Sequence, residues 1–156
     1  MTEEGSLIDL LVADVAGGEI DSRKSIVVEA GKGIVGDRYF HGKGRFSETL
    51  KGLPDVEVTL IEIEEIGALN NMVGWALDGA SFRRNIVTRG VRLNDLVGKE
   101  FSIGAVRLRG LRLCEPCAHL AQVLGNEIMQ HMVHKAGLRA RFLSSGEIHI
   151  SDTVSV

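Results

Sequence analysis

Two cysteines, Cys114 and Cys117, are the only thiols in the sequence, and two residues, Glu115 and Pro116, separate them. This spacing allows three kinds of chemistry. The pair can share a metal ion, close a disulfide bond, or present one activated thiol. Two cysteines in 156 residues are too few for a disulfide scaffold.

Zinc is the first alternative, because two histidines follow the cysteine pair. With His131 and His134 the spacing is Cys-x2-Cys-x13-His-x2-His. A two-Cys, two-His finger separates its histidines by about three to five residues, so the spacing here is too short. A chain of this length also builds its own core without a metal. We therefore expect no zinc and place both histidines on a helix surface.

A redox pair of the thioredoxin kind is the second alternative, but the surrounding sequence is rich in strands rather than alternating strands and helices. Pro116 cannot extend a strand, so we expect the chain to turn there. Cys117 would then lie near the N-terminus of a helix, where the helix dipole favours a thiolate. From the residues alone, one activated thiol and a pair of buried structural cysteines both remain open.

The charges of the chain are segregated although the net charge is only −3. Residues 1–82 carry 7 Lys/Arg against 15 Asp/Glu, whereas residues 83–112 carry 8 against 2. This basic block leads directly into the cysteine pair and suggests either an anionic partner or a solvated arginine-rich strand face. A pI near 6.0 and 4% aromatic residues argue against nucleic acid.

Composition and length indicate one globular domain over residues 1–156. The hydrophobic fraction is 44% and the charged fraction 25%, which is ordinary for a folded chain. The N-terminus begins with acidic residues and lacks the basic region of a signal peptide. No apolar run reaches the roughly 20 residues that a membrane helix needs. We expect a cytoplasmic protein with reduced thiols and no membrane partner.

Short strands dominate the expected secondary structure, and 19 glycines separate them. A glycine-rich loop is expected over residues 31–46 and helices over residues 61–72, 118–125 and 127–137, while residues 138–143 and 147–151 read as a hairpin. The other strands are expected over residues 7–15, 25–30, 56–60, 82–90 and 100–113. This pattern predicts a mainly β fold, a closed or nearly closed β-barrel with a few inserted short helices.

The sequence resembles a small stand-alone MOSC domain, the module named after the C-terminal part of molybdenum-cofactor sulfurases. The resemblance covers nearly the whole chain, and five segments carry it in order. They are GIVGDRYFHGKG at 33–44, TLIEIEEI at 59–66, FRRNIVTRGVRLNDLVGKEFSIG at 82–104, LRLCEPCAHL at 111–120 and AGLRARFL at 136–143. The family fold is a β-barrel of the pyruvate-kinase-barrel type, in agreement with the strand pattern.

The resemblance implies that Cys117 carries the chemistry. In related proteins the matching cysteine carries sulfane sulfur as a persulfide or binds the molybdenum of a pterin cofactor. Cys114 matches a more variable position, so it is either a resolving thiol or structural. The pyridoxal-phosphate desulfurase module of the eukaryotic sulfurases has no counterpart in this sequence, and we expect no pyridoxal phosphate on this chain.

A pterin cofactor carries a phosphate that basic or amide side chains must hold. Arg83 and Arg84 are the expected phosphate ligands, with Asn85 at the pterin edge. Gly36 lies in a loop whose backbone N–H groups suit an anion. Asp37 and Arg38 complete the Gly-Asp-Arg motif and either join this site or only cap the turn as a pair. Arg139 matches the family's GLRA element and is also expected to contact the anion.

These residues predict a molybdenum-cofactor-associated sulfur carrier or transferase, with Cys117 as the sulfur carrier or as a molybdenum ligand. The expected partners are a phosphorylated pterin or similar small anion, and a cysteine desulfurase or a molybdoenzyme. Two alternatives stay open. One is a non-catalytic module that binds and hands over the cofactor, and the other is a molybdenum-dependent reductase of N-hydroxylated compounds.

Overall fold

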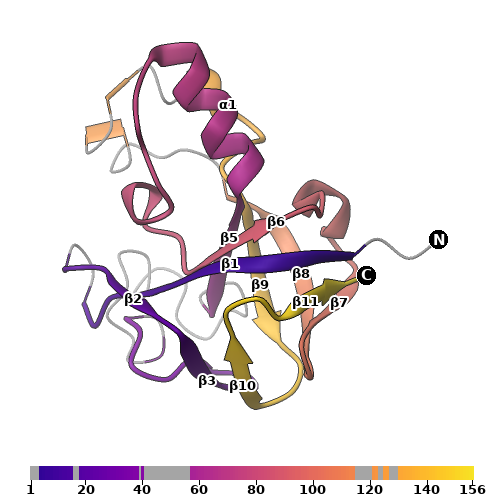
Figure 1. Cartoon of the computed structure of the whole chain (residues 1–156). Helices are drawn as coiled ribbons and strands as arrows, with labels where there is room; N and C mark the ends of the chain where they lie inside the picture. The colour runs from indigo at the N-terminus through magenta and orange to yellow at the C-terminus, as the bar shows by residue number, and fades with distance from the viewer. Residues whose placement is uncertain are drawn as a thin grey trace.

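Strands that alternate apolar and polar residues close into a barrel in the computed structural model of the chain. The structure describes residues 4–15, 18–38, 40, 57–114, 121–122, 125–126 and 130–156. The barrel is a ring of seven strands joined in the order β11–β7–β8–β9–β5–β6–β1, and β1 pairs again with β11 (Figure 1). These strands are β1 (Glu4–Val12), β5 (Val58–Glu62), β6 (Ile86–Arg89), β7 (Glu100–Ile103), β8 (Val106–Leu113), β9 (Leu138–Phe142) and β11 (Thr153–Ser155).

The ring confirms the predicted mainly β, closed barrel. β5 and β6 run parallel, while the other neighbours in the ring are antiparallel, so the barrel is mixed. β2 (Asp21–Arg23) extends the sheet as a partner of β1. Closure pairs the first strand of the chain with the last, with Glu4 opposite Ser155. The pairing removes the open edges that would otherwise need protection.

Apolar residues fill the barrel and also cover part of its outer face. Leu10, Leu60, Ile86 and Leu138 belong to the inner core and are fully buried. A second cluster lies on the outer face of β1, β5 and β6, where Leu11, Ile61 and Val87 pack with residues of helix α1 (Ile63–Val73). The alternation of neighbouring residues between the two clusters follows from the two-residue period of a strand.

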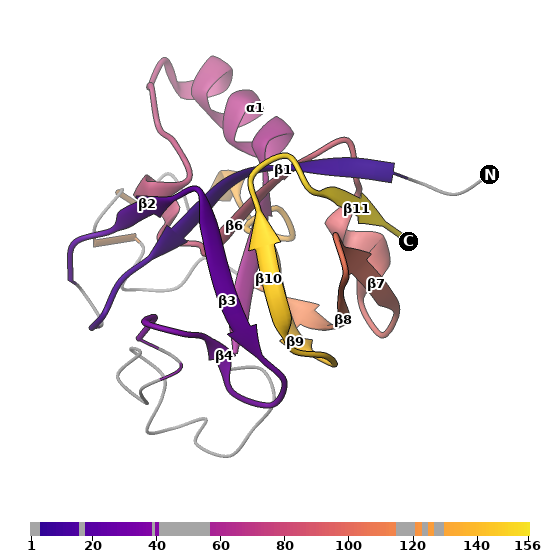
Figure 2. The same cartoon turned by 60° about the horizontal axis from the view of Figure 1, so that its bottom comes forward.

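The predicted hairpin over residues 138–151 is wrong in its pairing. β9 pairs with β5 and β8, whereas β10 (Gly146–His149) joins a separate three-stranded sheet with β3 (Ser25–Glu29) and β4 (Gly33–Ile34). In Figure 2 this sheet lies in front of the barrel. Two side chains of the turn bind other segments: Ser144 Oγ accepts from Arg107 N–H and Ser145 Oγ from Ala30 N–H. These bonds direct the chain into the second sheet.

The helix predictions are confirmed in part. α1 (Ile63–Val73) matches the prediction over 61–72 and buries Ile66 and Leu69, whereas Met72 is 58% exposed. The helix predicted over 127–137 does not extend through its second half: residues 133–136 form turns and a bend, and His134 has a left-handed φ of 61°. The chain also contains short 3-10 turns, η2 (Ala80–Phe82) and η3 (Leu93–Leu96). Within the described ranges, no helix is long and apolar enough to cross a membrane.

Candidate functional site

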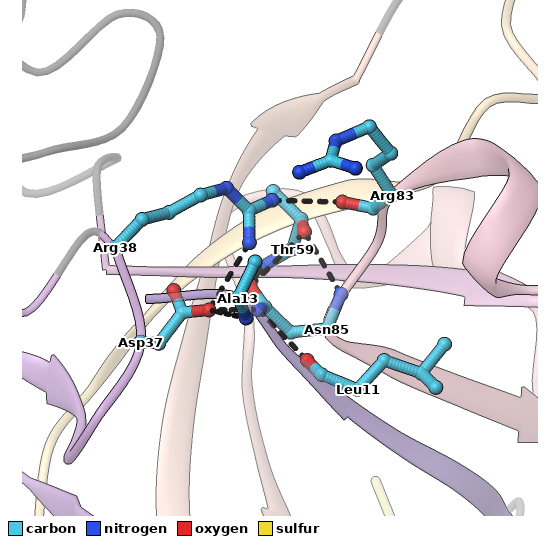
Figure 3. A network of polar contacts seen from close by, with 7 residues as sticks. All are labelled: Leu11, Ala13, Asp37, Arg38, Thr59, Arg83 and Asn85. Atoms are coloured by element: carbon cyan, nitrogen blue, oxygen red, sulfur yellow. Dashed lines mark hydrogen bonds and ion pairs between the residues drawn. The ribbon is translucent and has the colours of Figure 1, made fainter. Parts of the chain in front are cut away.

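A buried polar network lies at the end of the barrel where β1 ends and β5 and β6 begin (Figure 3). Its centre is Asn85, the residue before β6, which is 0% exposed. The Oδ1 atom of Asn85 accepts hydrogen bonds from the N–H of Thr59 at 3.0 Å and from its hydroxyl at 3.2 Å. Its Nδ2 donates to Leu11 O at 3.2 Å and to Asp37 Oδ1 at 3.1 Å. The amide therefore joins three strands to the loop that follows β4.

Asp37 and Arg38 form an ion pair inside this network. Arg38 Nη1 lies 3.0 Å from Asp37 Oδ1, and the two side chains are 5% and 0% exposed. The same carboxylate oxygen accepts the N–H of Ala13 at 3.1 Å. A carboxylate buried this completely requires such partners, because an uncompensated buried charge costs several kcal/mol. This arrangement matches the alternative in which Asp37 and Arg38 cap the turn as a pair.

Arg38 also holds the turn that carries the two adjacent arginines. Its Nη2 donates to the carbonyl of Arg83 at 2.8 Å. Arg83 follows η2 and has a left-handed backbone, with φ 56° and ψ 32°. This conformation costs a residue with a side chain roughly 1–2 kcal/mol. The bond from Arg38 helps to stabilise the turn and thus the directions in which the side chains of Arg83 and Arg84 leave it.

Arg84 connects the turn to the segment before β9. Its side chain is partly buried, and its Nε donates to the carbonyl of Ala136 at 2.9 Å. The next carbonyl, that of Gly137, accepts the N–H of Cys114 at 2.8 Å. Cys114 is 3% exposed and carries a free thiol. Two consecutive carbonyls therefore bring the arginine turn and the start of the cysteine segment together.

Gly137 makes this arrangement possible through its lack of a side chain. Its φ is +109°, and a Cβ atom there would overlap the carbonyl oxygen of Leu60. Glycine permits both the backbone conformation and the close approach to β5. The chain can therefore pass against the barrel wall and still present the carbonyls of Ala136 and Gly137 to its neighbours.

Arg139 lies on the same outer row as the network. It stands opposite Thr59 on β5 and opposite Arg112 on β8, and it is 7% exposed. The row therefore runs from Asn85 through Thr59 to the two arginines across four neighbouring strands. Residues directly opposite each other on neighbouring strands share one face of the sheet.

The predicted site residues fall into three groups. The first group consists of residues connected by these hydrogen bonds or adjacent in the chain, namely Asp37, Arg38, Arg83, Arg84 and Asn85. Gly36, beside Asp37, has a φ of +90° with open space where a Cβ would be, and Arg139 lies opposite Thr59 on the same outer row. Cys117 lies outside the described residues, so its role stays a prediction.

Asn85 has no hydrogen-bonding group left for a ligand. Its oxygen accepts two bonds and its nitrogen donates two, which uses the capacity of the amide. A direct contact with a pterin edge would require one of these bonds to break. The geometry therefore favours a positioning role for this residue, in which it holds Asp37 and the strand ends in place.

The sequence reasoning did not identify Thr59 and the carbonyls of Ala136 and Gly137 as part of the site. Thr59 stands between the apolar residues Val58 and Leu60 in a buried strand, with 1% of its surface exposed. A buried threonine in such a run needs a hydrogen-bond partner, which is a signal that could have linked it to Asn85. Backbone carbonyls give no sequence signal, although the glycine at 137 marks the close approach.

Two carboxylic acids near the barrel have raised pKa values. Burial raises the pKa of Glu57 above its usual value near 4.5, although the N–H of Phe142 and the charge of Arg141 act in the opposite direction. Burial likewise raises the pKa of Glu62, whose carboxylate lies 3.5 Å from Arg92. The hydrogen bond from Arg92 to Glu65 in turn raises the pKa of that guanidinium. Both acids therefore favour the neutral form more than exposed carboxyls do.

The donors around this barrel end suit a phosphate better than a metal. Arg83, Arg84 and Arg139 offer guanidinium groups, which bind phosphate through paired hydrogen bonds. In the part of the chain that the structure describes, no group of three His, Cys, Asp or Glu residues is placed to hold a metal ion. The arginines at this barrel end thus suit an anionic group such as a phosphate.

Comparisons with known proteins agree with this architecture. The YuaD protein of Bacillus subtilis superposes with a TM-score of 0.84 at 15% identity, over 99% of this chain and 96% of that one. The YiiM proteins of Geobacillus stearothermophilus and Escherichia coli give TM-scores of 0.67 and 0.66 at 17% and 16% identity. These two matches cover 97% and 96% of this chain, and 75% and 70% of theirs. At such identities the likeness shows the fold.

Sequence comparison supplies the family. No curated protein is similar enough in sequence to match the chain. The family model of the MOSC domain matches residues 30–155, which include the Gly-Asp-Arg motif, the arginine turn and both cysteines. The chain belongs to the MOSC domain family.

Proposed function

We propose that the protein is a molybdenum-cofactor-associated sulfur carrier in which the thiolate of Cys117 accepts and delivers sulfane sulfur. One observation carries the proposal furthest: the arginine turn and the start of the cysteine segment are bound to adjacent carbonyls, those of Ala136 and Gly137. Cys117 follows Cys114 by three residues in the sequence, and its place beside the arginines is part of this proposal. Positive charge near a thiol favours its ionised, nucleophilic form.

The arginines provide the binding part of the proposal. Arg83 and Arg84 would hold the phosphate of a pterin cofactor, and Arg139 would contribute from β9. When bound, the cofactor would supply a molybdenum centre, for which a soft thiolate is a suitable ligand. Cys117 is the residue proposed for that ligand.

The sulfur-transfer step requires only the thiolate and a persulfide donor. The Sγ atom of Cys117 attacks the outer sulfur of the donor persulfide and forms a new S–S bond. The S–S bond of the donor breaks, and its inner sulfur leaves as a thiolate with the electron pair. The outer sulfur then stands on Cys117 and is delivered to an acceptor by the same exchange in reverse.

Three residues take positioning roles in this proposal. Asn85 and Asp37 connect the ends of β1, β5 and β6, and Arg38 holds the carbonyl of Arg83. None of the three needs to touch the cofactor. Their contribution is to keep the turn with Arg83 and Arg84 fixed before a ligand arrives, which reduces the entropy lost on binding.

Cyanide treatment tests the sulfur-carrier role. Freshly purified protein incubated with a persulfide donor is desalted and treated with cold cyanide, and the released thiocyanate is measured. We expect thiocyanate from the wild type and from Cys114→Ala, but not from Cys117→Ala. Equal release from the wild type and Cys117→Ala would end the persulfide proposal. Bound pterin without any release would instead favour the module that hands over a finished cofactor.

A further inference from the structure

Arginines stand directly opposite each other on the outer face of β8 and β9. Arg109 on β8 pairs in register with Arg141 on β9, and Arg112 pairs with Arg139. The flanking residues Leu108 and Phe142 point into the core, so the arginines occupy the outer face. Arg109, Arg112 and Arg141 are exposed. Like charges directly opposite on neighbouring strands destabilise a sheet, so an arrangement of this kind needs an explanation.

A β-bulge creates the second of these pairs. The register shifts between Gly110 and Arg112, so that two residues of β8 stand against one residue of β9. Simple alternation from Arg107 and Arg109 would place Leu111 opposite Arg139. The bulge places Arg112 there instead, and bulges often re-aim side chains at binding sites. The local fold thus lines up a second pair of arginines.

The neighbouring strands compensate this charge only in part. β8 and β9 contain no acidic residue, and β7 contributes Glu100, which stands opposite Arg109 in register while its carboxylate binds Arg107 at 3.2 Å. Glu57 interacts electrostatically with Arg141, but its carboxylate is buried and accepts the N–H of Phe142, whereas Arg141 is exposed. Arg109 and Arg141 are nevertheless exposed, so an anion can reach both side chains from outside.

We propose that this outer face of β8 and β9, the arginine face, is a docking surface for an extended acidic segment of a partner protein. Arg107 and Arg109 are both exposed on β8 and two residues apart, and two residues of strand advance the chain by roughly 6.8 Å. Alternate side chains of an extended peptide have the same spacing, so its carboxylates can meet successive arginines. Guanidinium groups bind carboxylates through two parallel hydrogen bonds, which adds geometric selectivity to the charge.

A peptide fits this face better than a nucleic acid does. Single-stranded nucleic acids gain much of their binding energy by stacking bases on aromatic side chains. The aromatic residues of β7 and β9, Phe101 and Phe142, are both buried inside the barrel. Docking on the arginine face needs only the arginines, so it does not depend on the chemistry of Cys117. Because β8 leads into Cys114, a docked segment would lie beside the start of the cysteine segment.

Fluorescence anisotropy with a short labelled peptide of alternating Glu and Ser tests the proposal. We expect the wild type to bind it, and Arg109→Gln/Arg141→Gln to bind about tenfold more weakly. The matched control is Arg89→Gln, which changes an exposed strand arginine on β6 and should leave the affinity unchanged. Binding should weaken as ionic strength rises, because these charges are exposed to solvent.

Charge reversal makes the test independent of a simple loss of folding. Arg109→Glu/Arg141→Glu should no longer bind the Glu-Ser peptide and should gain affinity for a Lys-Ser peptide of equal length. Its melting temperature should not fall below that of the control Arg89→Glu. Equal binding of the Glu-Ser peptide by the wild type and the Gln variant would overturn the proposal. Stronger competition by an oligothymidylate than by unlabelled Glu-Ser peptide would also overturn it, in favour of nucleic acid.

Discussion

Arg84 and Cys114 are bound to consecutive carbonyl groups of one segment, with distances of 2.9 Å from Arg84 Nε to Ala136 O and 2.8 Å from Cys114 N to Gly137 O. The two residues come from different parts of the chain and meet only because this segment passes between them. The basic turn and the start of the cysteine segment are therefore held in a fixed relation by the backbone. This relation is the structural basis of the proposed function.

Gly137→Ala should disturb both partners at once. A Cβ at this position would overlap Leu60 O, and the left-handed φ of +109° is unfavourable for alanine. We expect a loss of about 3 kcal/mol in the free energy of unfolding, measured by urea denaturation. Gly67→Ala, on the open surface of α1, is the matched control and should be neutral or stabilising. An unchanged stability of Gly137→Ala would contradict the close approach described here.

Asn85→Ala should destabilise the barrel although it removes only a small side chain. The change leaves the N–H of Thr59 and the carbonyl of Leu11 without their side-chain partners inside the protein. We expect a loss of about 3 kcal/mol in chemical denaturation, since each unsatisfied buried group costs roughly 1–3 kcal/mol. Asn71→Ala on the exposed face of α1 should stay within about 0.5 kcal/mol of the wild type. Equal losses for both variants would refute the central role of Asn85.

Arg38→Met should remove the cation that pairs with the buried carboxylate of Asp37. Removing one partner of a buried ion pair costs about 3–5 kcal/mol. The double variant Arg38→Met/Asp37→Asn should recover part of this loss, because the charge is then gone while the side-chain oxygen can still accept the N–H of Ala13. A double-mutant cycle in urea measures the coupling. Strictly additive effects would show that the pair contributes no interaction energy.

Glu57→Gln should change how stability depends on pH. The folded pKa of Glu57 is raised above the unfolded value near 4.5, so ionisation of Glu57 opposes folding as the pH rises through the folded pKa. Glutamine removes this charge and retains an oxygen for the N–H of Phe142. The stability of the variant relative to the wild type should therefore rise with pH above about 4.5, by at most about 1.4 kcal/mol per pH unit. A difference that stays constant from pH 4 to 8 would contradict a raised pKa.

The sequence predicts the barrel well because strand periodicity and glycine turns are local signals. β3 (Ser25–Glu29) and α1 (Ile63–Val73) fall close to their predicted ranges for this reason. The partner of β10 was mispredicted because its pairing with β3 depends on contacts between distant segments. A turn of the Ser-Ser-Gly kind favours a hairpin locally, but it does not exclude a change of sheet.

The candidate site was predictable in its residue types and only partly in its geometry. The Gly-Asp-Arg motif and the arginine turn are visible in the sequence, but the bond between Asp37 and Asn85 joins residues 48 positions apart. The amide of Asn85 looked suited to a ligand, and only the structure reveals that its four bonds are internal. The bulge that aligns Arg112 with Arg139 also breaks the simple alternation on which strand predictions depend.

Molybdenum and pterin analysis of protein purified from a host that makes the cofactor tests the central claim most directly. We predict that wild-type protein retains both. Arg84→Glu should lose pterin. Its free energy of unfolding should fall only slightly, because the change breaks a single hydrogen bond, that to Ala136 O. Cys117→Ser should keep pterin and lose molybdenum, and Arg89→Glu should behave as the wild type. Equal pterin content in the wild type, Arg84→Glu and Arg89→Glu would contradict an anion site at the arginine turn.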